Sequence, residues 1–377
     1  MNDDKKIKPK NERNKRKIKG YVLWGGIALA AVLLLSVTLT LLLYRPDVED
    51  RPQFPTDTPP VGTNDKEASA EPYKRKENFY TFLIAGMDAA SNNTDVLMLA
   101  SLDAKNGEIR IVQIPRDTYI NKEVGGYKSL TRVNGIYSAA YNSKIREGIS
   151  AKTAKTLAMK DLQKCLSEAL CINIDEYVLV NTSGFRSVID AVGGIDYEVP
   201  RDMFYEDPEQ DLYIDLKAGY QHLDGTQCEH LIRYRSGYAT GDIGRVELRS
   251  DFMVEVFKQV KNKISLDSML KIIRDDELMQ KIHTSMSLLD IFAYVKMAYA
   301  LDDDAIDVRM ISGEVVQNPN TGAWIYYCLN KKGALKDINE CLNVYEHEIE
   351  LSLFDSKEFF SGTQGASDHY IYEYYHS

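Results

Sequence analysis

Four arginines lie close together in one glycine-containing stretch of the chain, LIRYRSGYATGDIGRVELR at residues 231–249. They are Arg233, Arg235, Arg245 and Arg249. Guanidinium groups stay charged at neutral pH and bind phosphate oxygens through paired hydrogen bonds. The stretch therefore indicates an anion-binding site. The alternative is a solvated basic face whose partners are Asp242 and Glu247.

The elements predicted around this stretch would bring the arginines together. Residues 225–235 predict a helix that opens after Asp224-Gly225, and residues 244–264 predict a longer amphipathic helix. Arg245 and Arg249 are one turn apart and share a face of the second helix. Glycines in the connecting loop allow a close approach to a ligand, and N–H groups at the start of the second helix would face the same anion.

Two acids form a second candidate site. Asp88 follows the apolar run at 78–86, and Asp95 begins the apolar run at 95–102. If the two runs are neighbouring strands, these carboxylates lie close and need a cation, a proton or an arginine between them. Mg²⁺ suits such a site because it takes oxygen ligands and keeps positions for water or phosphate oxygens. The alternative is that both acids only cap turns.

A third loop, QIPRDTYI, places Arg116 and Asp117 directly after a predicted strand that ends at Pro115. Taken alone, this dipeptide is typical of a surface ion pair worth less than about 1 kcal/mol. Taken together, paired carboxylates and a ring of arginines are the recurrent arrangement for phosphate or pyrophosphate chemistry.

The fold class follows from the order of the apolar runs. The runs at 78–86, 95–102 and 108–115 predict strands, and Asn106-Gly107 between the last two predicts a hairpin. Helical spacing at 152–170 leads into the strand-like run DEYVLVNT. Strands that alternate with helices predict an α/β domain with a mixed central β-sheet flanked by helices.

The N-terminal segment predicts a membrane anchor. Residues 1–20 are rich in Lys and Arg, and residues 21–44 carry no charge over a length that could cross a bilayer as a helix. The basic tail predicts a cytoplasmic N-terminus, with everything after Arg45 extracellular. The alternative is a cleaved signal peptide. Residues 45–77, rich in Pro and acids, predict an extracellular linker.

Composition and location narrow the ligand. The net charge of −10 argues against nucleic-acid binding across the surface. No P-loop pattern is present, and the arginine-rich domain is expected outside the cell, where ATP is scarce. These observations favour a lipid-carried phosphate. The five cysteines are an odd number without zinc-type spacing, and Cys328 with Cys341 is a possible disulfide.

Several motifs then resemble the LytR-CpsA-Psr family in order and spacing. They are FLIAGMD, TDVLMLASLD, EIRIVQIPRDTY, RVNGIYSAAY, VNTSGFRSVIDAVGGIDYEVP, GYQHLDGTQCEHLIRYRS and GDIGRVE. The close match covers residues 79–255 and a looser one reaches 314, so we expect the family domain at 78–314 and a C-terminal region of unknown role at 315–377.

The resemblance implies a cell-wall enzyme that transfers a glycopolymer from an undecaprenyl-pyrophosphate carrier to peptidoglycan, with Mg²⁺ as cofactor. The metal would be held by Asp88 and Asp95. Arg116, Arg233, Arg235 and Arg245 would bind the pyrophosphate and stabilise charge, with Asp117 orienting the arginines. Arg132 stands where the family usually has Lys. The polyprenyl tail would enter an apolar pocket between the sheet and the helices.

Two departures from the family pattern concern charge. Family members often have an arginine shortly before the second acid, whereas this loop reads AASNNT. A Gln is frequent one turn after the Arg245 position, where this chain has Arg249, so Arg249 is also expected to reach the pyrophosphate. Two other functions use the same residues: a pyrophosphatase that acts on the lipid carrier, and a non-catalytic protein that binds lipid-linked glycan.

Overall fold

The structure is a computed structural model of the whole chain. It describes residues 44–48, 74–87, 92–120, 132–208, 212–234, 242–317 and 324–354. The chain divides into two compact units, Met1–Asp47 and Val48–Ser377. Only residues 44–47 of the first unit are described, and they contain no helix or strand. Within the described ranges, no helix has the length and apolar character of a membrane span. The span expected at 21–44 lies outside these ranges except for Tyr44.

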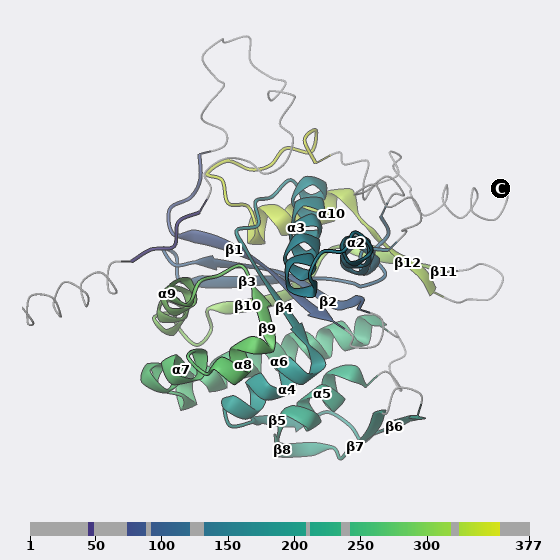
Figure 1. Cartoon of the computed structure of the whole chain (residues 1–377), viewed down its shortest axis with the longest axis vertical. Coiled ribbons are helices and arrows are strands. Elements are labelled where there is room, and N and C mark those ends of the chain that lie inside the picture. Colours follow the sequence, from purple (N-terminus) through teal and green to yellow (C-terminus); the bar gives the residue numbers. More distant parts are fainter. Residues whose placement is uncertain are drawn as a thin grey trace, which may run out of the picture. The chain divides into compact units, whose positions relative to one another are not determined.

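A six-stranded mixed sheet forms the centre of the second unit (Figure 1). Its strands, in spatial order, are β10 (Ile306–Met310), β3 (Glu108–Ile114), β2 (Thr94–Asp103), β1 (Phe79–Met87), β4 (Glu176–Asn181) and β9 (Ile282–Thr284). The β1–β4 and β10–β3 pairs are parallel, and the other three pairs are antiparallel. The expected mixed α/β sheet is confirmed.

The hairpin predicted at Asn106-Gly107 joins β2 to β3. Gly107 has φ +76°, in the left-handed region where a side chain is strained. The Asp103 carboxylate accepts hydrogen bonds from the backbone N–H groups of Lys105 and Asn106, at 3.1 and 2.9 Å. Asp103 and Glu108 are directly opposite in the register, so the turn fixes which residues of the two strands share a face.

One face of the sheet is covered by three helices (Figure 1). They are α2 (Gly135–Arg146), α3 (Ala151–Leu170) and α10 (Lys331–Cys341). Alternate residues of β1, including Leu83 and Ala85, are completely buried in this core together with Leu162 of α3 and Ile338 of α10. The helix predicted at 152–170 is therefore α3, and its apolar residues cover this face of the sheet.

The other face lies against α6 (Asp242–Lys263) and α9 (Leu288–Tyr299) (Figure 1). Met98, Ala100 and Ile111 point to this side and pack with Met253 of α6. Tyr294 of α9 makes edge-to-face contacts with Tyr80 and Phe82, with ring centroids 5.1 and 4.8 Å apart. Two shorter helices, α7 (Leu266–Ile273) and α8 (Asp276–Gln280), connect these elements.

A second, smaller core carries the elements around the arginine-rich stretch. Its members are α4 (Thr182–Ala191), β5 (Ile195–Val199), β6 (Met203–Asp207), β7 (Leu212–Leu216), β8 (Gly219–Leu223) and α5 (Gly225–Arg233). Asp224 caps α5 in a capping box with Gln227, as the sequence predicts for a helix that opens there. Leu248 and Phe252 of α6 also belong to this core, so α6 contacts both the small core and the central sheet.

The C-terminal region is part of the main core. β11 (Gly313–Gln317) pairs with β12 (Trp324–Leu329), and Tyr327 and Leu329 of β12 are buried with α10 in the core. Residues 74–76 pair with residues 344–346, and the buried Arg75 bonds both oxygens of Asp175. The boundaries expected at residues 78 and 314 therefore do not separate the folded core from its flanks.

The possible disulfide between Cys328 and Cys341 is not formed. All five cysteines are free thiols. Burial raises the pKa of the Cys328 and Cys341 thiols to about 11, and that of Cys171 and Cys228 to about 12. These thiols are protonated at neutral pH. Cys171 and Cys341 are small apolar side chains of the main core, Cys228 is one of the smaller core, and Cys328 is partly buried.

Candidate functional site

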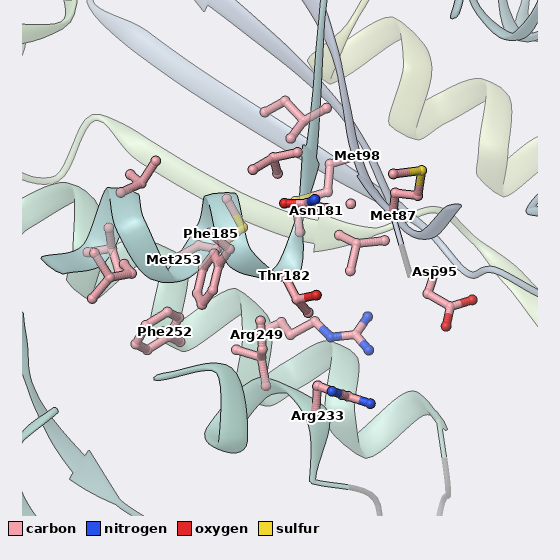
Figure 2. Close-up of a pocket in the computed structure, with 18 of the residues that line it drawn as sticks. Met87, Asp95, Met98, Asn181, Thr182, Phe185, Arg233, Arg249, Phe252 and Met253 are labelled. Carbon is pink, nitrogen blue, oxygen red and sulfur yellow. The ribbon is translucent and has the colours of Figure 1, made fainter. Parts of the chain in front are cut away.

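A cavity of about 320 Å³ opens where the central sheet meets α4, α5 and α6 (Figure 2). Its walls are mostly apolar. They include Ile84, Val96 and Met98 from β1 and β2, Phe185, Val188 and Ile189 from α4, and Phe252, Met253 and Val256 from α6. A concave, largely apolar pocket with a few convergent polar groups is typical of a ligand site.

Charged side chains gather at one end of this cavity. Asp95, Arg116, Arg233 and Arg249 line it, and each comes from a different element. Asp95 is in β2, Arg116 follows β3, Arg233 ends α5, and Arg249 is in the second turn of α6. Figure 2 shows Asp95, Arg233 and Arg249 on the opposite side of the cavity from Phe185, Phe252 and Met253. The three loops that the sequence singled out therefore meet at this end of the cavity. Three of the four charged residues there are arginines, so positive charge predominates.

Asp95 and Arg116 are held by an ion-pair chain. Arg116 lies 3.4 Å from a carboxylate oxygen of Asp95 and 3.4 Å from one of Asp117. Asp117 also lies 3.2 Å from Arg132. The carboxylate of Asp117 therefore contacts two arginines, and its expected role in orienting them stays a prediction.

Arg132 does not line the cavity. Its guanidinium lies over the Tyr326 ring at 5.4 Å from the centroid. Tyr326 belongs to β12, whose backbone bonds the segment 117–119 through Tyr327. In this structure Arg132 therefore helps to fix the loop after β3. Its expected contact with the pyrophosphate stays a prediction.

Strand geometry explains why the site forms at this place. β1 and β4 are parallel and end together, because Gly86 and Met87 are opposite Val180 and Asn181. A Cβ at Gly86 would lie 2.9 Å from the Cβ of Val96, so only glycine lets β1 and β2 approach here. Asn181 caps α4 by accepting from the Gly184 N–H at 2.8 Å, and Thr182 begins that helix in the cavity wall.

The sequence reading missed a buried acid behind the arginines. Glu229 of α5 is 4% exposed, and its carboxylate is 2.9 Å from Arg233 and 3.0 Å from Arg186 of α4. The signal was available, because Glu229 and Arg233 are four residues apart on a predicted helix. On sequence alone such a pair is indistinguishable from an exposed one.

A second apolar space lies beside the cavity. A groove of about 450 Å³ runs between the sheet and helices α6 and α9, and it shares Ile84, Met253 and Val256 with the cavity. Its lining also includes Phe82, Ile111 and Phe257. The cavity and the groove therefore lie next to each other on this face of the sheet.

Some predicted site residues are outside the described parts of the chain. Asp88 and Arg235 lie there, and Arg245 is described only by its place in α6. Among described residues, no group of three His, Cys, Asp or Glu side chains could hold a metal ion. The cavity lining supplies one carboxylate, Asp95, whose oxygen chemistry suits Mg²⁺.

The chain belongs to the LytR_cpsA_psr family. The sequence profile of that family matches residues 57–342, which is more than half of the chain. The family resemblance drawn from the motifs is therefore confirmed. The matched range includes β12 and α10, in agreement with their place in the main core.

Two relatives carry the names of transferases. The polyisoprenyl-teichoic acid–peptidoglycan teichoic acid transferase TagV of Bacillus subtilis strain 168 is 25% identical over 252 residues, which cover 65% of this chain and 60% of TagV. TagU of Bacillus cereus ATCC 14579, a transferase of the same name, is 27% identical over 312 residues, which cover 82% of this chain and 89% of TagU. The chain thus spans about 60% of the length of TagV.

Solved structures show the same fold. The crystal structure of B. subtilis TagV superposes with a TM-score of 0.53 at 23% identity, covering 70% of this chain and 95% of that one. A structure of TagT bound to LIIa-WTA gives a TM-score of 0.54 at 19% identity, covering 70% of this chain and 89% of TagT.

Proposed function

We propose that this protein is a cell-wall transferase that attaches a glycopolymer to peptidoglycan, taking it from an undecaprenyl-pyrophosphate carrier. One observation carries the proposal: arginines from three elements gather at one end of a cavity whose other walls are apolar. That arrangement matches a ligand with an anionic head and an apolar tail. The names of TagV and TagU, which refer to polyisoprenyl-linked teichoic acid and peptidoglycan, support it.

The pyrophosphate would bind among Arg116, Arg233 and Arg249. Their guanidinium groups line a cavity with apolar walls, where charge-assisted hydrogen bonds to phosphate are stronger than in water. Arg235 and Arg245, expected to bind the same group, are neighbours in sequence of Arg233 and Arg249. Arginines fixed before the ligand arrives stabilise charge on the leaving phosphate without further reorganisation.

The polyprenyl tail would follow the route from the cavity into the groove. The residues shared by the two spaces, Ile84, Met253 and Val256, place them side by side. Each buried CH₂ of such a tail contributes about 0.8 kcal/mol, so a few isoprene units anchor the carrier strongly. The glycan, attached to the other end of the pyrophosphate, would remain on the solvent side of the arginines.

The reaction is a phosphoryl-type displacement. A peptidoglycan hydroxyl oxygen attacks the phosphorus that carries the glycan and forms a new P–O bond. The bond from that phosphorus to the bridging oxygen breaks, and undecaprenyl phosphate leaves with the bridging oxygen and its electron pair. The hydroxyl proton passes to a carboxylate, for which Asp95 in the lining and Asp117 beside Arg116 are the candidates.

Mg²⁺ is part of the proposal. Asp95 would hold it together with Asp88, and the bound ion would neutralise charge on the pyrophosphate oxygens. A metal-bound carboxylate is a poor base. If Asp95 holds the ion, proton transfer therefore falls to Asp117.

We also propose that the protein is anchored in the cell membrane by residues 21–44, with its basic N-terminus in the cytoplasm and the folded domain outside. This location gives the domain access to both the lipid carrier and the wall. The carrier would then be extracted from the outer leaflet of the same membrane.

The test is turnover of a lipid-pyrophosphate glycan by the full chain in detergent, with peptidoglycan oligomers as acceptor and with or without Mg²⁺. We expect metal-dependent transfer that is lost in Asp95→Ala and Arg233→Ala and kept in Arg274→Ala, which removes an exposed arginine outside the lining. Carrier cleavage without attachment would instead identify a pyrophosphatase. Lipid binding that needs Arg233 but gives no product would identify a binding protein.

A further inference from the structure

Glu229 is a buried negative charge placed directly behind a site that we propose to bind an anion. Its side chain is 5% exposed, whereas those of Arg233 and Arg186 are 28% and 42% exposed. By Coulomb's law alone, a carboxylate at this place weakens anion binding. Its burial is also costly unless it is paired. A structural benefit must therefore offset both effects.

The contacts show what this benefit is. One carboxylate oxygen of Glu229 accepts a hydrogen bond from Nη1 of Arg233 at 2.9 Å, and the other is 3.0 Å from Nε of Arg186. Arg186 is in α4 and Arg233 ends α5, so the carboxylate connects the two helices that form one wall of the cavity. A guanidinium held at one nitrogen loses much of its rotational freedom before a ligand binds.

Backbone packing fixes the position of α5 relative to α4. α5 begins at Gly225, where a Cβ would lie 2.3 Å from the backbone oxygen of Arg186. The N–H of Gly225 also donates to Asp190 of α4 at 2.8 Å. The two helices are therefore in direct contact one turn before Glu229, and the backbone of Glu229 cannot shift relative to α4 without breaking this contact.

We propose that Glu229 is a positioning residue for the pyrophosphate site. Glu229 orients Arg233 toward the cavity through one carboxylate oxygen, and Arg186 holds Glu229 in place through the other. This inference rests on the proposed anion-binding function of the cavity. Its consequence is that removal of a negative charge next to the site weakens anion binding, which is the opposite of the Coulombic expectation.

The experiment compares Glu229→Gln with the wild-type chain in full length. Binding of farnesyl pyrophosphate and of inorganic pyrophosphate is measured by calorimetry in detergent. We expect at least about fivefold weaker binding of both probes in Glu229→Gln. In this variant the guanidinium of Arg233 is no longer held in place in advance, so binding must also supply the free energy to order it. Unchanged or tighter binding in Glu229→Gln would overturn the proposal.

Glu255→Gln is the matched control. It removes one negative charge from α6, where Glu255 accepts from Gln259 at 2.6 Å and does not line the cavity. We expect this variant to bind both probes as the wild type does, or slightly more tightly. Equal weakening in both variants would show that general loss of charge or stability, and not the position of Arg233, causes the effect.

A second measurement needs no ligand. Phenylglyoxal modifies arginines, and mass spectrometry gives the rate at each one. In Glu229→Gln we expect faster modification of Arg233 and an unchanged rate at Arg116, which has its own partners in Asp95 and Asp117. Unchanged modification of Arg233 would overturn the positioning role, even if the variant binds pyrophosphate less well.

The two measurements also separate this inference from the proposed function. A wild-type chain that binds neither probe would contradict the proposed function, while the modification rates would still decide whether Glu229 orients Arg233. If Glu229→Gln does not fold, Arg186→Gln replaces it, because that change frees only the outer oxygen of Glu229. We then expect faster modification of Arg233 by a smaller factor, and no change would overturn the proposal.

Discussion

The two faces of the central sheet are built from alternate residues of the same strands, yet one face is filled and the other is hollow. On β1, Leu83 and Ala85 are completely buried under α2, α3 and α10. Their neighbours Phe82 and Ile84 face the groove under α6 and α9. The same strands therefore serve two purposes, since side chains in a strand alternate between its faces.

The difference between the faces lies in the helices. On the filled face, helix α3 carries nine buried residues, and seven of them belong to the same core as Leu83 and Ala85 of the sheet. On the hollow face, α6 divides its apolar residues between two partners: Phe252 is in the small core and Met253 packs against the sheet. A helix that contacts two cores cannot lie flat on either, and the cavity and groove are the space that this leaves.

The first prediction uses two consecutive residues. Leu83→Ala on the filled face should lower the free energy of unfolding by about 2–5 kcal/mol, because it creates a new cavity in a close-packed core. Ile84→Ala on the hollow face should cost less than half as much, because the space beside it already exists. Chemical denaturation of both variants checks this, and equal losses would mean that the two faces are packed alike.

The second prediction reverses the change of size. Ala85→Leu should destabilise by about 1–3 kcal/mol because the filled face has no room for three more carbons. Ala100→Leu, which faces the groove, should cost less than about 1 kcal/mol. Thermal unfolding measures both. A larger loss in Ala100→Leu than in Ala85→Leu would contradict the assignment of the hollow face.

The third prediction concerns the ligand on the hollow face. Binding of isoprenyl pyrophosphates should tighten at least about tenfold with each added isoprene unit until the groove is filled, because each unit buries further carbon atoms at up to about 0.8 kcal/mol each. Val256→Trp should abolish this gain, since Val256 lines both the cavity and the groove. Inorganic pyrophosphate is the control probe, and its affinity should not change in this variant. A length dependence that survives in Val256→Trp would place the tail elsewhere.

Much of the filled face could be predicted from sequence. The Asn-Gly turn and the helical spacing at 152–170 each indicated one element, and both are where they were expected. The contribution of β12 and α10 could not be predicted in this way. Tyr327 pairs with segment 117–119, and Glu346 pairs with Lys74, across more than 200 residues of chain. Such pairings depend on packing between distant segments, which local periodicity does not record.

The charged residues of the site were predicted individually, whereas its apolar lining was not. Asp95, Arg116, Arg233 and Arg249 were each expected near a phosphate, and they line one cavity. The family resemblance implied an apolar pocket between the sheet and the helices, but its lining could not be named, because β1 and β2 read as apolar on both faces whether or not a helix fills the space. Arg132 was assigned to the phosphate because it stands where the family usually has Lys, and its contact with Tyr326 depends on a strand almost 200 residues away.

The last prediction tests whether positive charge has moved within the site. The loop before Asp95 has no arginine where related proteins often have one, and Arg249 lines the same cavity from α6. Arg249→Gln should weaken binding of inorganic pyrophosphate about tenfold, corresponding to one charge-assisted hydrogen bond of about 1.5 kcal/mol. Arg249→Lys should retain part of the affinity, since it keeps the charge but not the paired donors.

A second change makes the result specific to the charge. Asn93→Arg added to Arg249→Gln returns an arginine to the loop two residues before Asp95. If the site requires a third positive charge and tolerates it from either side, calorimetry should show that this double variant recovers most of the lost affinity. If Arg249 acts only by packing against the cavity wall, the double variant should bind no better than Arg249→Gln. Of the described arginines that line the cavity, Arg116 and Arg233 would then provide the affinity for anions without a contribution from the charge of Arg249.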